Sequence, residues 1–122
     1  MWDELKGSDN IVRTLQWTAR VEGSDQYTTS KNAMTLSQYL GRGVVSRGRM
    51  TISTGLDTNV AEHPYLHNDV DLQTVIQGIK NLQAALNVIP NISWVLPPPN
   101  TTVESFVNNV SYLPLLSGPK DE

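Results

Sequence analysis

The segment from Tyr39 to Ile52, YLGRGVVSRGRMTI, gathers three arginines and three glycines in a chain whose formal net charge is −3. Such residues suit a phosphate-binding turn or an RNA-binding arm. A dinucleotide fingerprint needs glycines at its first, third and sixth positions, but the sixth residue counted from Gly41 is Ser46. An arginine–glycine RNA arm is longer and repetitive. We therefore predict a turn that leads into a strand, with arginines that face solvent or bond to carboxylates.

Two other pairs of residues have a spacing that suits chemistry. His63 and His67 are four residues apart, as two metal ligands on one helix face are, but Pro64 lies between them in the loop-like segment EHPYLHN. We interpret both as surface or helix-leading histidines and predict no metal site. Asp69 and Asp71 lie at the start of a predicted helix, which accounts for their charge. No serine lies in a nucleophile-elbow pattern, so the chain offers no catalytic set by itself.

The composition limits what the chain can be. Its 122 residues make one domain or a piece of one, and a hydrophobic content of 39% supports a modest core. The acidic balance argues against a nucleic-acid partner, and the absence of cysteine excludes disulfides and thiolate metal sites. No apolar run approaches the roughly 18 residues of a membrane-spanning helix, so no membrane association is expected. The N-terminus, MWDELKGSDN, lacks the basic start and apolar stretch of a signal peptide.

The first half of the chain predicts two strands and a short helix. Residues Leu15 to Val21 alternate between apolar and polar, which is typical of a half-buried strand. A polar loop follows from Glu22 to Asn32. Thr35 to Leu40 is predicted to form a short helix closed by Gly41. Arg47 to Ser53 alternates again and predicts a second strand.

The strongest element is a helix predicted from Asp69 to Val88. Its apolar residues recur at steps of three and four, which gives one apolar stripe; they are Leu72, Val75, Ile76, Ile79, Leu82 and Leu86. Asn68, Asp69 and Asp71 supply capping oxygens and negative charge at its start. Pro90 ends it.

The end of the chain predicts two short elements. Ile92 to Leu96 forms an apolar β-run before three prolines. Thr101 and Glu104 have the spacing of a capping box, which predicts a brief helix through Asn108. Strands and helices mix without a βαβ order, so the predicted fold class is α+β: a partial antiparallel sheet packed with one long and several short helices.

Three asparagines lie in glycosylation sequons: Asn91, Asn100 and Asn109. Glycans of this type occur on surface loops of secreted proteins. The sequons therefore indicate an extracellular parent protein.

Two long stretches together resemble one enzyme family. SQYLGRGVVSRGRMTI and HPYLHNDVDLQTVIQGIKNLQ are similar to the C-terminal substrate region of the glucose–methanol–choline flavin oxidoreductases, and in particular to their fungal cellobiose dehydrogenase branch. The family's serine-arginine-glycine motif matches residues 46–48. Its tyrosine-leucine pair and following aspartate match Tyr65, Leu66 and Asp69. The segments IVRTLQWTARVEG and AMTLSQYLGRG also resemble that branch.

The resemblance implies a fold and an activity. It runs from about Trp2 to about Asn109, and residues 1–109 are expected to be part of a substrate-binding domain. Residues 110–122 resemble nothing in the family and are expected to be a disordered tail. The implied parent is an extracellular, FAD-dependent dehydrogenase that oxidises the anomeric hydroxyl of cello-oligosaccharides to a lactone. Arg42 and Tyr65 lie in the matched region and are the candidate sugar contacts, because a guanidinium fork and an amphipathic ring both suit pyranose recognition. The alternative is a structural role, in which Arg42 bonds to carbonyls at a turn and Tyr65 packs at the entry of the helix.

The chain also departs from the family pattern. It has no glycine fingerprint for FAD, and it lacks the family's proton-accepting histidine in an Asn-His-Trp context, which neither His63 nor His67 matches. We therefore expect that this chain alone binds no FAD and is inactive. Two alternatives remain: a non-catalytic sugar-binding module, or a non-functional product of a truncated gene.

Overall fold

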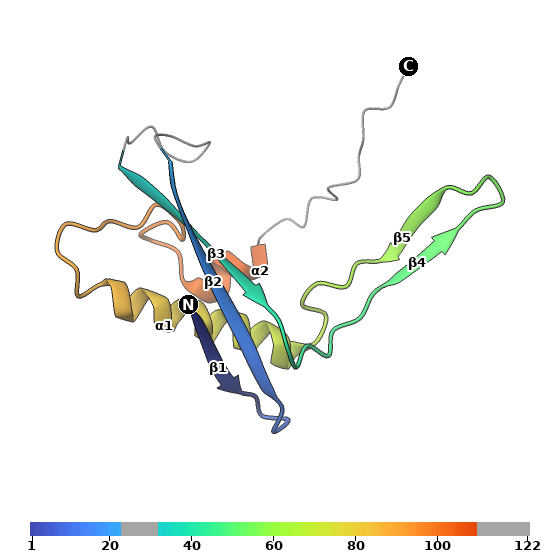
Figure 1. The fold of residues 1–122 in the computed structure, drawn as a ribbon, viewed down its shortest axis with the longest axis horizontal. Helices are drawn as coiled ribbons and strands as arrows, with labels where there is room; N and C mark the ends of the chain where they lie inside the picture. Colours follow the sequence, from blue (N-terminus) through green and yellow to red (C-terminus); the bar gives the residue numbers. More distant parts are fainter. Residues whose placement is uncertain (23–31, 110–122) are drawn as a thin grey trace, which may run out of the picture.

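We describe residues 1–22 and 32–109 of a computed structural model of the chain. They form five strands and two helices, in the order β1–β2–β3–β4–β5–α1–α2. Figure 1 shows α1 crossing the β1–β2–β3 sheet, while the β4–β5 hairpin extends away from it. All pairing is antiparallel, so the predicted α+β class is confirmed. The predicted tail, 110–122, and most of the polar loop predicted after Glu22 lie outside the described residues.

The main sheet has three strands in the order β1-β2-β3. The central strand β2 spans Val12–Glu22, so the strand predicted from Leu15 to Val21 is confirmed and begins three residues earlier. It pairs with β1 (Trp2–Lys6), which was not predicted, and with β3 (Ala33–Leu40).

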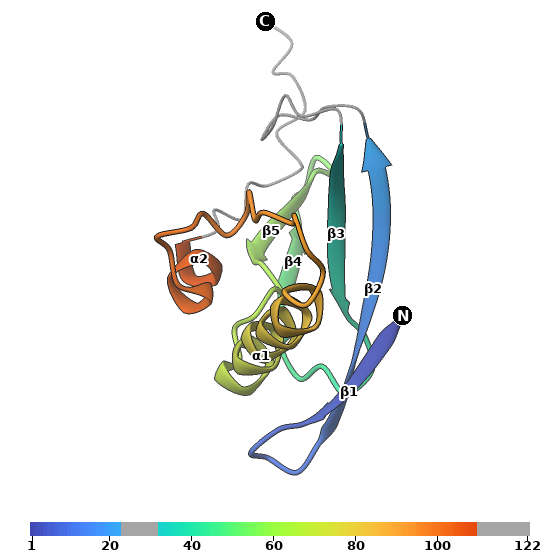
Figure 2. The ribbon, with the colours of Figure 1, turned by 90° about the vertical axis from the view of Figure 1, so that its left-hand side faces the viewer.

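The two faces of this sheet differ. Alternate residues of β2 point to opposite faces, and Arg13, Leu15 and Trp17 are buried on the face that α1 covers. Gln16 and Thr18, on the other face, are exposed. Figure 2 shows both helices on the same side of the sheet, and no described element lies on the opposite side.

The short helix predicted from Thr35 to Leu40 is wrong, because these residues belong to β3. Leu36 and Leu40 lie four residues apart on the same face of β3, and they pair with Ala19 and Leu15 of β2. Eight consecutive pairings to β2 outweigh the weak helical preference of this segment. Gly41 therefore ends no helix; its N–H donates to the Thr14 carbonyl at 2.9 Å.

A separate hairpin begins within the segment from Tyr39 to Ile52, which we call the Gly-Arg segment. Strand β4 (Arg49–Ile52) confirms the strand predicted from Arg47 to Ser53, and it pairs with β5 (Thr58–Glu62), which was not predicted. Every residue of both strands is exposed. An isolated two-stranded hairpin is marginal in water, and among the described elements β4 and β5 pack only against each other.

Helix α1 spans Asp69–Leu86, two residues shorter at its end than predicted, and it begins at the predicted cap. The Asn68 side chain accepts hydrogen bonds from the N–H groups of Val70 and Asp71. The helix is covered on two sides. Gly78 lies against Leu15 and Gln38 of the sheet, where a Cβ would collide with both side chains. On the other side, Ile76 packs against α2.

Helix α2 spans Val103–Asn109 and completes a small core. Val103 and Val107 are buried against Ile76 of α1. The capping residue was predicted one position too early. Thr102, not Thr101, caps the helix, because its hydroxyl accepts a hydrogen bond from the Ser105 N–H at 3.1 Å.

The β-run predicted from Ile92 to Leu96 is also wrong. These residues have no ladder partner within the described ranges: Ile92 to Trp94 have no regular structure, and Val95 and Leu96 form bends. The Trp94 indole N–H donates to the Asn87 side-chain oxygen at 2.9 Å, which ties the segment back to the end of α1. Local contact with the helix end and the prolines that follow, Pro97–Pro99, replace sheet pairing.

Candidate functional site

A buried ion pair lies where the sheet, the Gly-Arg segment and α1 meet. Arg13 Nε donates to Asp71 Oδ1 at 2.6 Å, and both side chains are completely buried. The other end of the guanidinium forms a fork with Asp9, with Nη1 and Nη2 at 2.9 and 2.8 Å from its two carboxylate oxygens. One arginine therefore bridges two carboxylates, one in the β1–β2 turn and one in the first turn of α1.

Asp71 also holds the Gly-Arg segment. Its Oδ2 accepts from the Ser46 hydroxyl at 2.5 Å, from the Ser46 N–H at 2.6 Å and from the Val45 N–H at 3.1 Å. The Ser46 hydroxyl in turn accepts from the Asn68 N–H at 3.0 Å. A single carboxylate thus fixes β2, the β3–β4 connection and the start of α1 relative to one another. We call this set of hydrogen-bonded residues the Asp71 network: Asp9, Arg13, Ser46, Asn68 and Asp71.

Two of the three glycines in the Gly-Arg segment are required by close backbone contacts. Gly43 has a φ of 86°, and a Cβ there would collide with the Val12 carbonyl. A Cβ at Gly48 would lie 2.5 Å from the Glu62 carbonyl oxygen and 2.7 Å from the Pro64 nitrogen. These glycines let the segment press against β2 and against the end of β5, as the predicted turn requires.

The charges of this network stabilise one another. The hydrogen bond from Arg13 holds the pKa of Asp9 at about 2, below its usual value. Burial raises the pKa of Asp71. Hydrogen bonds from Ser46, Arg13 and the Val45 N–H lower this pKa by more than burial raises it, so it lies below the ordinary value. The Asp9 and Asp71 hydrogen bonds raise the pKa of Arg13. All three groups are therefore ionised at neutral pH.

The predicted substrate residues lie at the edge of this network. Arg42 follows β3 with its N–H bonded to the Thr14 hydroxyl at 2.9 Å, and its side chain is exposed. Tyr65 lies in the β5–α1 connection and is 60% exposed. Next to it, Leu66 has a φ of 52° and packs towards the core, which turns the chain at this point. The hydrogen bond from the Asn68 N–H to the Ser46 hydroxyl joins the two segments that carry Arg42 and Tyr65.

His63 and His67 do meet, although not as helix neighbours. Their rings lie edge to face with centroids 4.5 Å apart, and His63 also stacks on Tyr65. Among residues 1–22 and 32–109, no three histidine, cysteine or acidic side chains come together as metal ligands. The histidines and Tyr65 form an aromatic cluster on the surface of the β5–α1 connection.

The other two arginines of the Gly-Arg segment have local partners. Arg47 Nη1 donates to the carbonyls of Val44 and Ser46 at 2.9 and 2.8 Å, and so holds its own turn. Arg49 pairs with Glu62 across the β4–β5 hairpin at 3.7 Å, with both side chains exposed. These contacts match the prediction that the arginines bond to carboxylates or face solvent.

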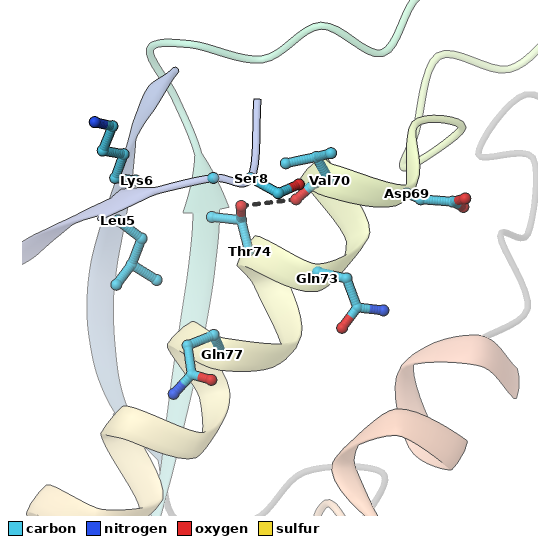
Figure 3. A pocket seen from close by; sticks show the side chains of 9 residues that line it. Leu5, Lys6, Ser8, Asp69, Val70, Gln73, Thr74 and Gln77 are labelled. Carbon is cyan, nitrogen blue, oxygen red and sulfur yellow. Dashed lines mark hydrogen bonds between the residues drawn. The ribbon is translucent and has the colours of Figure 1, made fainter. Parts of the chain in front are cut away.

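A shallow hollow of about 410 Å³ lies beside this network, between the β1–β2 turn and α1. Figure 3 shows Leu5 on the β1 side and Thr74 and Gln77 on the helix side. The Thr74 hydroxyl is already committed to the Val70 carbonyl at 2.7 Å. Neither Arg42 nor Tyr65 lines the hollow, so it does not join the predicted substrate residues.

The three sequon asparagines, Asn91, Asn100 and Asn109, are exposed. Asn91 has a φ of 64°, in a turn just after α1. The Asn109 side-chain amide donates to the Ser105 carbonyl at 2.7 Å. Within the described residues, the side-chain amides of Asn91 and Asn100 form no such hydrogen bond that a glycan would have to replace.

Sequence reasoning missed the centre of this site. It explained Asp71 as a helix-start charge, whereas the carboxylate is buried and accepts from four groups on two other segments. It did not consider Arg13. A signal was present, because extending the alternation of β2 by two residues places Arg13 on the buried face with Leu15 and Trp17.

Comparison with known protein families adds no assignment, since no family model matches the sequence. Within the described part of the chain, no helix is long and apolar enough to cross a membrane.

The buried ion pair and its hydrogen bonds are suited to holding segments of the fold in place rather than to catalysing a reaction. The oxygens of Asp71 are occupied by donors, and Arg13 is occupied by two carboxylates, so neither has a site left for a substrate. The network fixes the two connections that carry Arg42 and Tyr65. Its role in the fold is to fix the position of these connections and of the exposed side chains on them.

Proposed function

We propose that this chain is part of the substrate domain of an FAD-dependent sugar oxidoreductase of the glucose–methanol–choline type. Its role is to help position a cello-oligosaccharide for oxidation of the anomeric hydroxyl. The remaining parts of the enzyme, including the FAD site, belong to regions of the parent protein outside this chain.

One observation carries the proposal. The resemblance to that family rests on two separate stretches, one around Ser46 and one from Tyr65 to Asp71. In the fold the two stretches are joined, because Ser46 bonds to both Asp71 and the Asn68 N–H. If the two stretches work together as one motif, their residues should share hydrogen bonds in the fold. The bonds of Ser46 meet that expectation.

The uncovered surfaces support a larger parent. Many large apolar side chains are exposed, including several that are more than 60% exposed: Trp2, Val21, Met50, Ile52 and Leu56. The β4–β5 hairpin has no described neighbour to support its apolar face. Met50 and Ile52 lie on one face of β4 with Val60 opposite Met50, and an exposed apolar patch of this kind marks a surface that another domain or partner covers.

The described residues do not fit an FAD site. Pyrophosphate binding needs a glycine-rich turn between a strand and a helix, so that backbone N–H groups reach the phosphates. Helix α1 instead begins at Asn68 and carries Asp69 and Asp71 in its first turn, where carboxylates would repel a pyrophosphate. We therefore assign no step of the oxidation to this chain beyond binding the sugar.

Arg42 and Tyr65 are the proposed sugar contacts. Both are exposed, and the connections that carry them are joined by the hydrogen bonds of Ser46 with Asp71 and with the Asn68 N–H. An arginine fork donates to adjacent hydroxyls, and a tyrosine ring stacks on a pyranose face while its hydroxyl bonds to the sugar.

Sequencing the full-length transcript that contains the codons of residues 2–109 tests the proposal. We expect an in-frame glycine fingerprint before this region and an Asn-His-Trp-like segment after it. A transcript with neither segment in frame would overturn the proposal. A cooperative melt of the 122-residue chain would then favour a stand-alone binding module, and its absence would favour a non-functional product.

A further inference from the structure

The fold brings together the rings of His63 and His67, which are the two histidines of the chain. Pro64 prevents the helix that would align two imidazoles at a spacing of four residues, so the spacing alone predicts no metal site. The fold aligns the two rings without a helix. Both residues are exposed in the β5–α1 connection, with ring centroids 4.5 Å apart and ring planes inclined at 65°.

We infer that these two imidazoles, which we call the histidine pair, bind one divalent ion of a late transition metal, Cu²⁺ or Ni²⁺. Imidazole nitrogen is a ligand that both ions favour. Among residues 1–22 and 32–109, no third histidine, cysteine or carboxylate joins the pair as a ligand, so water completes the coordination. The inference does not rest on the oxidoreductase proposal, since it involves neither flavin nor sugar.

The separation of the two rings fits one shared ion. A metal lies about 2.0–2.1 Å from an imidazole nitrogen, and therefore roughly 3.2 Å from the ring centroid. Two rings bound at a right angle then have centroids about 4.5 Å apart, whereas a tetrahedral angle separates them by about 5.2 Å. The observed separation of 4.5 Å matches the right angle. Right angles between ligands are typical of the tetragonal sites of Cu²⁺ and Ni²⁺, whereas structural zinc sites are tetrahedral and closed.

The edge-to-face contact of the rings is compatible with this separation. A nitrogen of each ring must face the ion, and rotation about χ2 achieves this because the χ2 torsion of histidine is broad. The axis of that rotation passes close to the ring centre. The centroids therefore stay close to their observed separation while the nitrogens turn.

The backbone at both ends of the histidine pair is held in place. A Cβ at Gly48 would lie 2.9 Å from the His63 carbonyl carbon, so the Gly-Arg segment packs directly on the backbone there. Directly after His67, the Asn68 N–H donates to the Ser46 hydroxyl at 3.0 Å. Two ligands on a fixed turn lose less conformational entropy when they bind an ion than two ligands on a flexible chain.

The charges that flank the histidine pair favour a cation. Residues 62–69 include two carboxylates, Glu62 and Asp69, and no lysine or arginine. Arg49 of the neighbouring strand offsets one of these charges, because its Nη2 lies 3.7 Å from Glu62 Oε1. Asp69 is exposed in the first turn of α1. The carboxylates add attraction through charge without acting as ligands.

Titration of the 122-residue chain with Cu²⁺, supplied as its glycine complex to keep the ion soluble, tests the inference. We expect one tight, saturable site whose pulsed electron paramagnetic resonance spectrum shows two imidazole rings. The chain has two histidines in total, so no other residue gives this signal. Because both rings hold one ion, His63→Ala and His67→Ala should each weaken binding about tenfold or more. The double variant should bind little more weakly than either single variant.

Matched controls separate the histidine pair from other copper ligands. Asp57→Asn removes an exposed carboxylate from the β4–β5 turn and should leave the dissociation constant within about twofold. The terminal amine is present in every variant, so the binding that remains in the double variant measures its contribution. A titration in concentrated urea should lose the tight site, because the unfolded chain does not hold the two rings together.

Three results would overturn the inference. The first is equal binding by the wild type and the double histidine variant, which would assign copper to the terminal amine or to carboxylates. The second is wild-type affinity in both single variants, which would mean that the rings do not share an ion. The third is equal affinity with and without urea, which would mean that the fold builds no site. None of these results involves flavin or sugar, so they are distinct from a failure of the oxidoreductase proposal.

Discussion

Arg13 and Asp71 are 58 residues apart in the sequence and form an ion pair in which neither side chain is exposed to solvent. A charge buried in this way is tolerated because each partner has further hydrogen bonds: Arg13 to Asp9, and Asp71 to Ser46. The pair joins the sheet to α1 at the point where the Gly-Arg segment crosses between them.

Removing one partner of this pair should therefore be costly. We expect Asp71→Asn to lower the free energy of unfolding by about 3–5 kcal/mol, because it leaves Arg13 buried beside a neutral group. Urea denaturation followed by circular dichroism measures this change. Glu62→Gln, which breaks the exposed pair with Arg49, is the control and should cost no more than about 1 kcal/mol. Equal costs for the two variants would contradict a structural role for the buried pair.

The same pair predicts an acid sensitivity. The pKa values of Asp71 and Asp9 are below the ordinary value of about 3.9 in the folded state, so the unfolded chain takes up protons first as the pH falls. The stabilisation is complete above about pH 5 and should be lost as the pH falls towards 2. Urea midpoints measured from pH 7 to pH 2 should show this loss, and Asp71→Asn should have a flatter profile. A steeper profile in the variant would be inconsistent with a lowered pKa.

The glycines of the Gly-Arg segment make a third prediction. Gly43→Ala should destabilise the fold by about 2 kcal/mol or more, since its φ is positive and a Cβ would collide with the Val12 carbonyl. Gly41→Ala places a Cβ 3.1 Å from the Thr14 hydroxyl and should change the stability by less than about 1 kcal/mol. Thermal melts of the two variants compare them directly. If Gly41→Ala were the more harmful, the turn would differ from the one described.

The core between the helices gives a fourth prediction. Ile76 is 3% exposed and packs against Val103 and Val107, so Ile76→Ala should cost about 2–5 kcal/mol. Ile52→Ala, at a position that is 70% exposed, is the matched control and should be close to neutral in the isolated chain. An unchanged unfolding midpoint for Ile76→Ala would mean that α1 and α2 form no core.

The sequence predicted the elements with strong local patterns. The stripe of α1 and its Asn68 cap, and the alternation of β2, are periodic over many residues, so propensity, burial and capping agree. It failed at Thr35–Leu40, where pairing with β2 decides the structure, and at Ile92–Leu96, where the apolar run has no strand beside it. Pairing partners are set by the tertiary fold, and short runs do not encode them locally.

In the candidate site, too, local features were predictable from the sequence and long-range contacts were not. The turn character of the Gly-Arg segment was predictable, because glycine spacing is a local signal. The Asp71 network was not, since it joins residues from β2, the β3–β4 connection and α1. The register of the main sheet was likewise not predictable, since two of its three strands, β1 and β3, were not predicted as strands.

The most direct test of the central claim is the rate of cellobiose-dependent dye reduction by the protein made from the full-length transcript that contains residues 2–109. The account predicts a flavoprotein that reduces the dye when cellobiose is added, while the 122-residue chain alone does not. Arg42→Ala and Tyr65→Ala in that protein should raise KM for cellobiose with a smaller effect on kcat, since both residues are proposed to bind sugar. A full-length protein without flavin, or one whose dye reduction does not depend on the sugar, would contradict the account.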